Sequence, residues 1–337
     1  MSMLKFTRYA EWWEYKLVPL VSIGYAAIIL NHYPFERTVE RLLLLLLSVI
    51  TGAIYVSVIN DLTDIREDAD AGKENRMANV ALWQRILIVG LCLAAGICWG
   101  YLIWPDKLSL FFYAMAWVVF SVYSIPPARL KKRGIWGVFA DAMGAHFFPS
   151  LLIVSNLFYI SGTRINLMWA IATGVWALFY GMRGILWHQF YDRGNDILTQ
   201  TKTFATRIQP ENFRLAESMI FIVELAAFSL VVVALFNFWI LFAIVIYLVL
   251  VVARMKGLKY KTSIIITPPD APYQLLMNDL YLALFPLALL LTITLTQRYG
   301  WALLCLHIGL FPRQIFQVMR EFLLIATLTL RKLKVIQ

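Results

Sequence analysis

The stretch LLLLLLSVITGAIYVSVINDLTDIRED, residues 42–68, joins two unlike segments without a break. Residues 42–59 carry no charged side chain, and about 20 apolar residues suffice to cross the hydrocarbon core of a bilayer as a helix. Residues 60–68 then bring four carboxylates together. Apolar blocks of this length do not alternate as the strands of a membrane barrel do. The stretch therefore predicts a transmembrane helix that ends in an acidic segment.

The rest of the chain repeats the apolar half of this pattern. Of its 337 residues 61% are hydrophobic and 15% charged, whereas a soluble domain carries about 25% charged residues. This excludes a water-soluble globular protein and predicts an all-α, polytopic membrane protein with a single domain over 1–337. The apolar segment 301–330 is either a tenth span or a surface helix. We expect nine transmembrane helices near 17–33, 39–60, 84–104, 108–125, 135–160, 166–189, 215–237, 238–253 and 279–297.

The net charge of +10 is unevenly placed, because Lys and Arg gather in the loops after the even-numbered spans. By the positive-inside rule these loops and the N-terminus face the cytoplasm, which predicts a multi-pass protein of the inner or plasma membrane. In a membrane protein, such an excess of Lys and Arg indicates which loops face the cytoplasm and needs no nucleic acid to explain it. We therefore expect no nucleic-acid partner. The three cysteines lie in apolar stretches without CxxC spacing, which favours neither disulfides nor a thiolate metal site.

Two acidic motifs follow the second and the sixth predicted spans. In the first, Asn60, Asp64 and Asp68 have i, i+4, i+8 spacing and would share one helix face. In the second, Asp192 and Asp196 repeat the i, i+4 pair. Like charges at this spacing destabilise a helix, so the repetition indicates a cation rather than a solvated acidic surface. Oxygen ligands without His or Cys suit Mg²⁺, with Mn²⁺ as the alternative.

Basic residues lie near both motifs and could hold phosphate oxygens by charge-assisted hydrogen bonds. Between the motifs runs YSIPPARLKKRG, residues 123–134, where Lys132 and Arg133 are expected only to set topology. The candidate phosphate ligands are Arg66, Lys73, Arg76, Tyr123, Arg129, Lys131 and Lys202.

In these motifs the chain resembles the UbiA superfamily of intramembrane prenyltransferases, which carries NDxxDxxxD after the second helix and DxxxD after the sixth of a nine-helix bundle. Residues 123–131 are also similar to the YSxPPxxLK stretch of the chlorophyll-synthase-like branch, with Arg129 where Lys is common. Residues 73–77 and 199–203 depart from the family pattern. The resemblance implies that Asn60, Asp64, Asp68, Asp192 and Asp196 bind Mg²⁺ and a prenyl diphosphate, that Asp61 supports them, and that Tyr123, Arg129 and Lys131 contact the diphosphate.

The function expected from this resemblance is Mg²⁺-dependent transfer of an isoprenoid chain from a prenyl diphosphate to an unidentified acceptor, aromatic or lipid-like. Asp64, Asp68, Asp192 and Asp196 would be catalytic. His188, four residues before Asp192, would orient or deprotonate the acceptor or, equally, form a structural hydrogen bond. Aromatic side chains would house the isoprenoid tail, among them Trp117, Trp176 and Phe179.

Other functions fit parts of the pattern. A terpene cyclase of the same family would use the same diphosphate site without an acceptor, and only product analysis separates the two. A secondary transporter would place its charges near the bilayer centre, whereas these motifs lie at helix ends. A non-catalytic lipid-binding protein leaves the paired carboxylates unexplained. Within the spans, Asp141 and His146 are expected to make separate interhelical contacts, and Glu224 has no evident partner.

Overall fold

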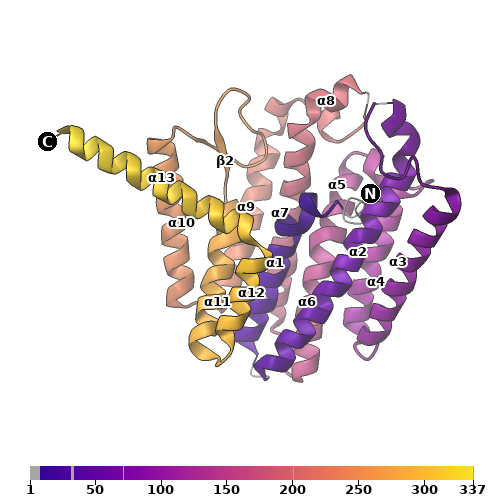
Figure 1. Ribbon diagram of the computed structural model, residues 1–337, viewed down its shortest axis with the longest axis horizontal. Coiled ribbons are helices and arrows are strands. Elements are labelled where there is room, and N and C mark those ends of the chain that lie inside the picture. Colours follow the sequence, from indigo (N-terminus) through magenta and orange to yellow (C-terminus); the bar gives the residue numbers. More distant parts are fainter. Residues whose placement is uncertain (1–7, 32–33, 71, 200, 337) are drawn as a thin grey trace.

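The computed structural model describes residues 8–31, 34–70, 72–199 and 201–336, and most of them are helical. Long helices stand side by side in one bundle, with the C-terminal helix running out across it (Figure 1). The first half comprises α1 Tyr9–Leu30, α2 Phe35–Asp70, α3 Leu82–Ile103, α4 Lys107–Ser124, α5 Ile135–Ala142 and α6 Phe148–Ser161. The second comprises α7 Leu167–Tyr191, α8 Arg193–Leu198, α9 Pro210–Ala234, α10 Phe238–Gly257, α11 Phe285–Thr296, α12 Gly300–Leu310 and α13 Pro312–Ile336.

Each of the nine predicted spans overlaps a helical segment of the bundle. Two of the segments contain π-turns, η3 Met143–Phe147 between α5 and α6 and η5 Leu280–Leu284 before α11. Within the described residues, seven helices are long and apolar enough to cross a membrane, or eight if one bent pair counts as a single span. The chain is therefore an all-α integral membrane protein, as its composition predicts.

The length of α2 places the first acidic motif outside the hydrocarbon layer. Its 36 residues extend for about 54 Å at 1.5 Å per residue, whereas the hydrocarbon core is about 30 Å thick. The surplus turns carry the motif at the C-terminal end of α2. The second motif lies at the end of α7 and on α8, at the same end of the bundle (Figure 1).

The C-terminal segment is not one straight helix. It is broken into α12 and α13, which meet at 86°. Pro312 lacks a backbone N–H and disfavours helical geometry in the preceding residue, so the break falls after Phe311. The carboxylate of Glu14 on α1 accepts hydrogen bonds from the backbone N–H groups of Arg313 (2.9 Å) and Gln314 (3.0 Å) and so caps the start of α13.

A small parallel sheet, which the sequence analysis did not foresee, follows α10. Strand β1, Lys261–Ser263, pairs with β2, Tyr273–Leu275. Three-residue strands are too short to give a periodic pattern, which is why the sequence carries no signal for them.

Aromatic side chains pack together where α7, α9 and η5 meet. Trp176, Tyr180, Phe228 and Tyr281 form an aromatic cluster there, with the rings of Phe228 and Tyr281 4.7 Å apart. Trp176 is fully buried in this cluster.

Candidate metal and diphosphate site

The first acidic motif faces a basic loop. Asp64 accepts hydrogen bonds from Lys131 Nζ at 2.6 and 2.7 Å, one to each carboxylate oxygen, and from Arg129 Nη2 at 2.7 Å. These three residues are called the Asp64 clamp below. Lys132 and Arg129 also form ion pairs with Glu67, so the basic loop and the end of α2 are joined by several charged contacts.

Local backbone geometry presents the basic side chains of the clamp. Arg129 adopts the left-handed region with φ of +38°, which costs a non-glycine residue some energy and is found disproportionately at functional sites. A 3₁₀ turn, η2 Leu130–Lys132, follows immediately. Burial lowers the pKa of Lys131, an effect that the carboxylate of Asp64 opposes. The clamp is therefore a tight but partly solvated cluster of charge.

Asn60 and Asp68 lie one turn before and one turn after Asp64. Asn60 Oδ1 accepts hydrogen bonds from Ser124 Oγ (2.5 Å) and Lys131 Nζ (3.5 Å). Asp68 accepts one from Nδ2 of Asn75 at 2.6 Å. The predicted common face of the motif is therefore present, and each of its members already has a protein partner.

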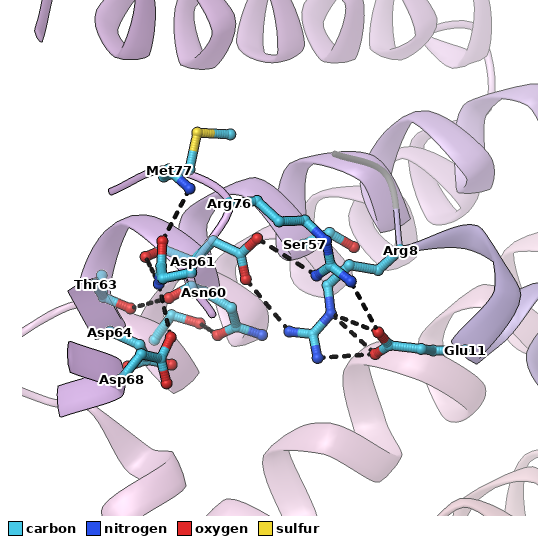
Figure 2. Close-up of polar contacts among 12 residues, drawn as sticks. Arg8, Glu11, Ser57, Asn60, Asp61, Thr63, Asp64, Asp68, Arg76 and Met77 are labelled. Atoms are coloured by element: carbon cyan, nitrogen blue, oxygen red, sulfur yellow. Dashed lines mark hydrogen bonds and ion pairs between the residues drawn. The ribbon is translucent and has the colours of Figure 1, made fainter. Parts of the chain in front are cut away.

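Asp61 points to a different set of residues (Figure 2). It is buried and forms ion pairs with Arg8 at 3.3 Å and Arg76 at 3.7 Å, both of which also contact Glu11. Asp61 thus ties the start of α1 and the loop after α2 to the motif helix. The structure pairs Arg76 with these carboxylates rather than directing it toward the Asp64 clamp.

The second motif is smaller, and the charge of Lys73 acts on it. The carboxylate of Asp192 lies 3.0 Å from His188 Nδ1. Asp196 is buried, and this burial raises the pKa of its carboxyl, whereas the positive charge of Lys73 opposes the rise. Because Lys73 follows the first motif, its charge is shared between the regions of the two motifs. Two other candidate phosphate ligands, Arg66 and Lys202, are exposed.

A cavity of about 1040 Å³ opens below the motifs, and of the predicted site residues Asn60, Tyr123 and His188 line it. A second, apolar cavity of about 100 Å³ extends between α1, α2, α4 and α6. Both cavities are lined by Trp12, Lys16, Val56 and Ser57, so they adjoin. The smaller one is called the apolar channel below. Trp117 lines the channel, whereas Trp176 and Phe179 do not.

The donor atoms of the two motifs suit a hard cation. No three His, Cys, Asp or Glu side chains lie close enough together to hold a metal within 8–31, 34–70, 72–199 and 201–336. Mg²⁺ needs no such cage, because it is usually bound by one or two carboxylates, with water and substrate phosphates completing its shell. Asn60, Asp64 and Asp68 on one side and Asp192 and Asp196 on the other can supply such partial ligand sets.

Several polar contacts that the sequence analysis missed border the larger cavity. Arg183 donates Nε and Nη2 to Glu224 at 2.6 and 2.9 Å, although the two residues are 41 positions apart on α7 and α9. Lys16 lies 3.6 Å from Asp141, and Arg254 pairs with Asp279 and Glu321. A charged residue within a predicted span is recognisable from the sequence as energetically costly. Its partner on another helix is not, because the two residues have no regular spacing along the chain.

Comparison with known proteins gives one family match and several structural matches. The model of the UbiA prenyltransferase family matches residues 18–264. A UbiA homolog from Archaeoglobus fulgidus bound to GPP and Mg²⁺ superimposes with a TM-score of 0.57 at 18% identity, covering 89% of this chain and 98% of the homolog. The same homolog bound to DMAPP and Mg²⁺ gives 0.54 at 17% identity, covering 89% and 97%. No curated protein matches the sequence. At these identities the structural likeness shows the fold.

Proposed function

Because the chain belongs to the UbiA prenyltransferase family and is thus an intramembrane prenyltransferase, we propose that it uses Mg²⁺ to transfer the prenyl group of a prenyl diphosphate to a second, hydrophobic acceptor. One observation carries the proposal: Asn60 of the first acidic motif lines a large cavity of mixed polarity, and this cavity adjoins an apolar channel. A prenyl diphosphate likewise has a charged group at one end and an apolar chain at the other. The solved homolog, which shares the fold, was bound to GPP or DMAPP with Mg²⁺.

The diphosphate would occupy the charged end. Asn60, Asp64 and Asp68 from α2, with Asp192 and Asp196 from the α7–α8 junction, would hold Mg²⁺, which supplies charge neutralisation of the leaving group when bound. Lys131 and Arg129 would then exchange Asp64 for phosphate oxygens. Both retain some solvent exposure, 13% and 18% of the side chain, so the exchange needs no buried charge to be left alone.

Ionisation of the allylic C–O bond leaves negative charge on the diphosphate and positive charge on the prenyl group. Preorganised positive charge near the diphosphate would come from Lys131, Arg129 and Lys73. The prenyl cation would form where the two cavities adjoin, at Trp12, Val56 and Ser57. The apolar channel excludes water there, which protects the cation from hydrolysis.

The larger cavity has room for an acceptor. At about 1040 Å³ it is roughly ten times the volume of the channel and exceeds what a diphosphate needs. His188 lines this cavity and contacts Asp192, so it is placed to orient an acceptor near the donor. The same region would face the cytoplasm by the distribution of Lys and Arg.

The test is incubation of purified protein in detergent with Mg²⁺ and labelled prenyl diphosphates of increasing length, with and without membrane extract, followed by mass spectrometry. A prenylated product that depends on the extract is expected. Efficient release of a cyclic hydrocarbon from donor and Mg²⁺ alone would instead establish a terpene cyclase. Mn²⁺ in place of Mg²⁺ is expected to support the same product.

A further inference from the structure

The side chain that bounds the apolar channel toward α3 is Trp117 of α4. Its ring lies 4.7 Å from that of Tyr55 and 6.0 Å from that of Tyr113, both of which also line the channel. No residue of α3 lines the channel among the described residues, although α3 packs against α2 and α4. The indole therefore separates the channel from the helix beyond it.

Two glycines make room for this indole. A methyl group on Gly96 of α3 would lie 2.7 Å from two atoms of the Trp117 ring, closer than a Cβ atom can approach. Gly52 of α2 faces the indole nitrogen, with 3.7 Å to where its Cβ would be. The hydroxyl of Tyr113 donates a hydrogen bond to the carbonyl oxygen of Gly96 at 3.1 Å, which fixes α3 against the aromatic side chains. Trp117 is thus held in place from three sides.

The remaining space is short. The channel has a volume of about 100 Å³, a tenth of that of the larger cavity that it adjoins. Along α2 the channel lining runs from Ser48 to Ser57, about 14 Å at the helical rise per residue.

We propose that Trp117 closes the apolar channel toward α3 and so makes the protein prefer short prenyl diphosphate donors to long ones. The inference rests on the proposed function and adds the chain length of the donor to it. Removal of the indole would extend the channel to the space in front of Gly96 on α3, the helix whose side chains Leu93 and Ile97 are exposed. A longer tail could then pass.

The test measures binding, so it needs no acceptor. Labelled geranyl diphosphate is bound to the protein in detergent with Mg²⁺ and displaced by the unlabelled five-, ten-, fifteen- and twenty-carbon prenyl diphosphates. The wild-type protein is expected to bind the ten-carbon donor at least tenfold more tightly than the twenty-carbon donor. In Trp117→Ala this ratio should fall at least tenfold, with Trp117→Leu as a second variant should Trp117→Ala not accumulate.

Two further variants complete the test. One should narrow the channel, and the other is a control that should leave it unchanged. Gly96→Ala should push the indole and weaken the ten-carbon donor relative to the five-carbon donor. Trp99→Ala removes another indole from the same α2–α3 interface, where Nε1 donates to Thr51 Oγ1 at 2.9 Å outside the channel, and should leave the ratios unchanged.

The outcomes separate this inference from the proposed function. Equal affinity of the wild-type protein for ten- and twenty-carbon donors, or a loss in Trp117→Ala that is the same for every donor, would overturn the role of Trp117 and leave the proposed function standing. Failure of all four donors to bind the wild-type protein in the presence of Mg²⁺ would overturn both.

Discussion

The Asp64 clamp and the Arg183–Glu224 pair are both built from close contacts between a carboxylate and a basic side chain, yet their surroundings differ. In the clamp, Asp64 keeps 25% of its side chain exposed, whereas Glu224 keeps none and Arg183 only 3%. Charges near water can change partners at little cost, but buried charges cannot be separated without a large penalty. The same chemistry thus serves ligand exchange at the helix ends and rigid packing within the bundle.

The largest loss of turnover is expected when only the metal and diphosphate site at the helix ends is disabled. Chelation of divalent cations, Asp64→Ala and Asp192→Ala are each expected to reduce turnover by at least about 10²-fold, because preorganised charge at the leaving group is lost. The thermal unfolding temperature should hardly change, since these side chains are partly solvated. Turnover is followed by product mass spectrometry. Near wild-type turnover after exhaustive metal removal would contradict the two-motif site.

The opposite result is expected at the buried pair. Glu224→Ala leaves the guanidinium of Arg183 buried without its charge partner and should lower the free energy of unfolding by about 3–5 kcal/mol. Detergent-solubilised protein is compared by thermal unfolding. The double variant Arg183→Met with Glu224→Leu is the matched control and should recover most of the loss, because no charge remains buried. If Glu224→Ala unfolds like the wild-type protein, the pair is not what holds α7 to α9.

Substitution of either basic residue of the Asp64 clamp should weaken donor binding more than substitution of the neighbouring Lys132. Lys131→Ala and Arg129→Ala are each expected to weaken donor binding by about 1.5–3 kcal/mol, the contribution of a charge-assisted hydrogen bond. Lys132 is more exposed, contacts Glu67 rather than Asp64, and should matter much less. Titration with a labelled donor in Mg²⁺ measures this. Three equal losses would mean that the loop acts only through its net charge.

The smallest effect is expected at His188, whose side chain is 66% exposed although it contacts Asp192. His188→Ala should lower transfer by about tenfold, or about 1.4 kcal/mol in the barrier, with donor affinity within twofold of the wild-type value, because the carboxylates remain. Rates and donor affinities are measured on the same preparation. A parallel loss of affinity and rate would place His188 beside the diphosphate instead.

The parts of the site that depend on neighbours along one helix were predictable. The spacing of Asn60, Asp64 and Asp68 fixes their common face, and the apolar runs fix the helices that carry them. The partners of Asp61 were not predictable, because Arg8 and Arg76 reach it from outside the motif and the contact depends on how α1 packs against α2. The lining of the apolar channel was likewise not predictable from the sequence. Trp117 and Trp176 have similar apolar surroundings in the sequence, and only packing separates a channel wall from a core residue.

The break between α12 and α13 was predictable in part. Pro312 and Arg313 mark an interruption in the apolar run, but the direction that the chain takes afterwards depends on residues far away. Glu14 caps α13 from the first helix, and Arg254 binds Glu321 from α10. Neither contact has any local signal, and together they decide that α13 turns across the bundle.

That cap has a consequence for biogenesis. Glu14 joins α1 to the start of α13, 299 positions later, and α12 reinforces the contact through Tyr25–His307 at 3.1 Å and the hydrogen bond from Trp13 Nε1 to the carbonyl of Leu310. Arg313, Gln314 and Gln317 then complete one wall of the large cavity. A ribosome makes α1 long before residues 313–317, so a nascent chain can have α1 in the bilayer while its partner on α13 is still unmade. This wall of the cavity forms only after residues 313–317 have been made, and a chain terminated near residue 300 would lack it.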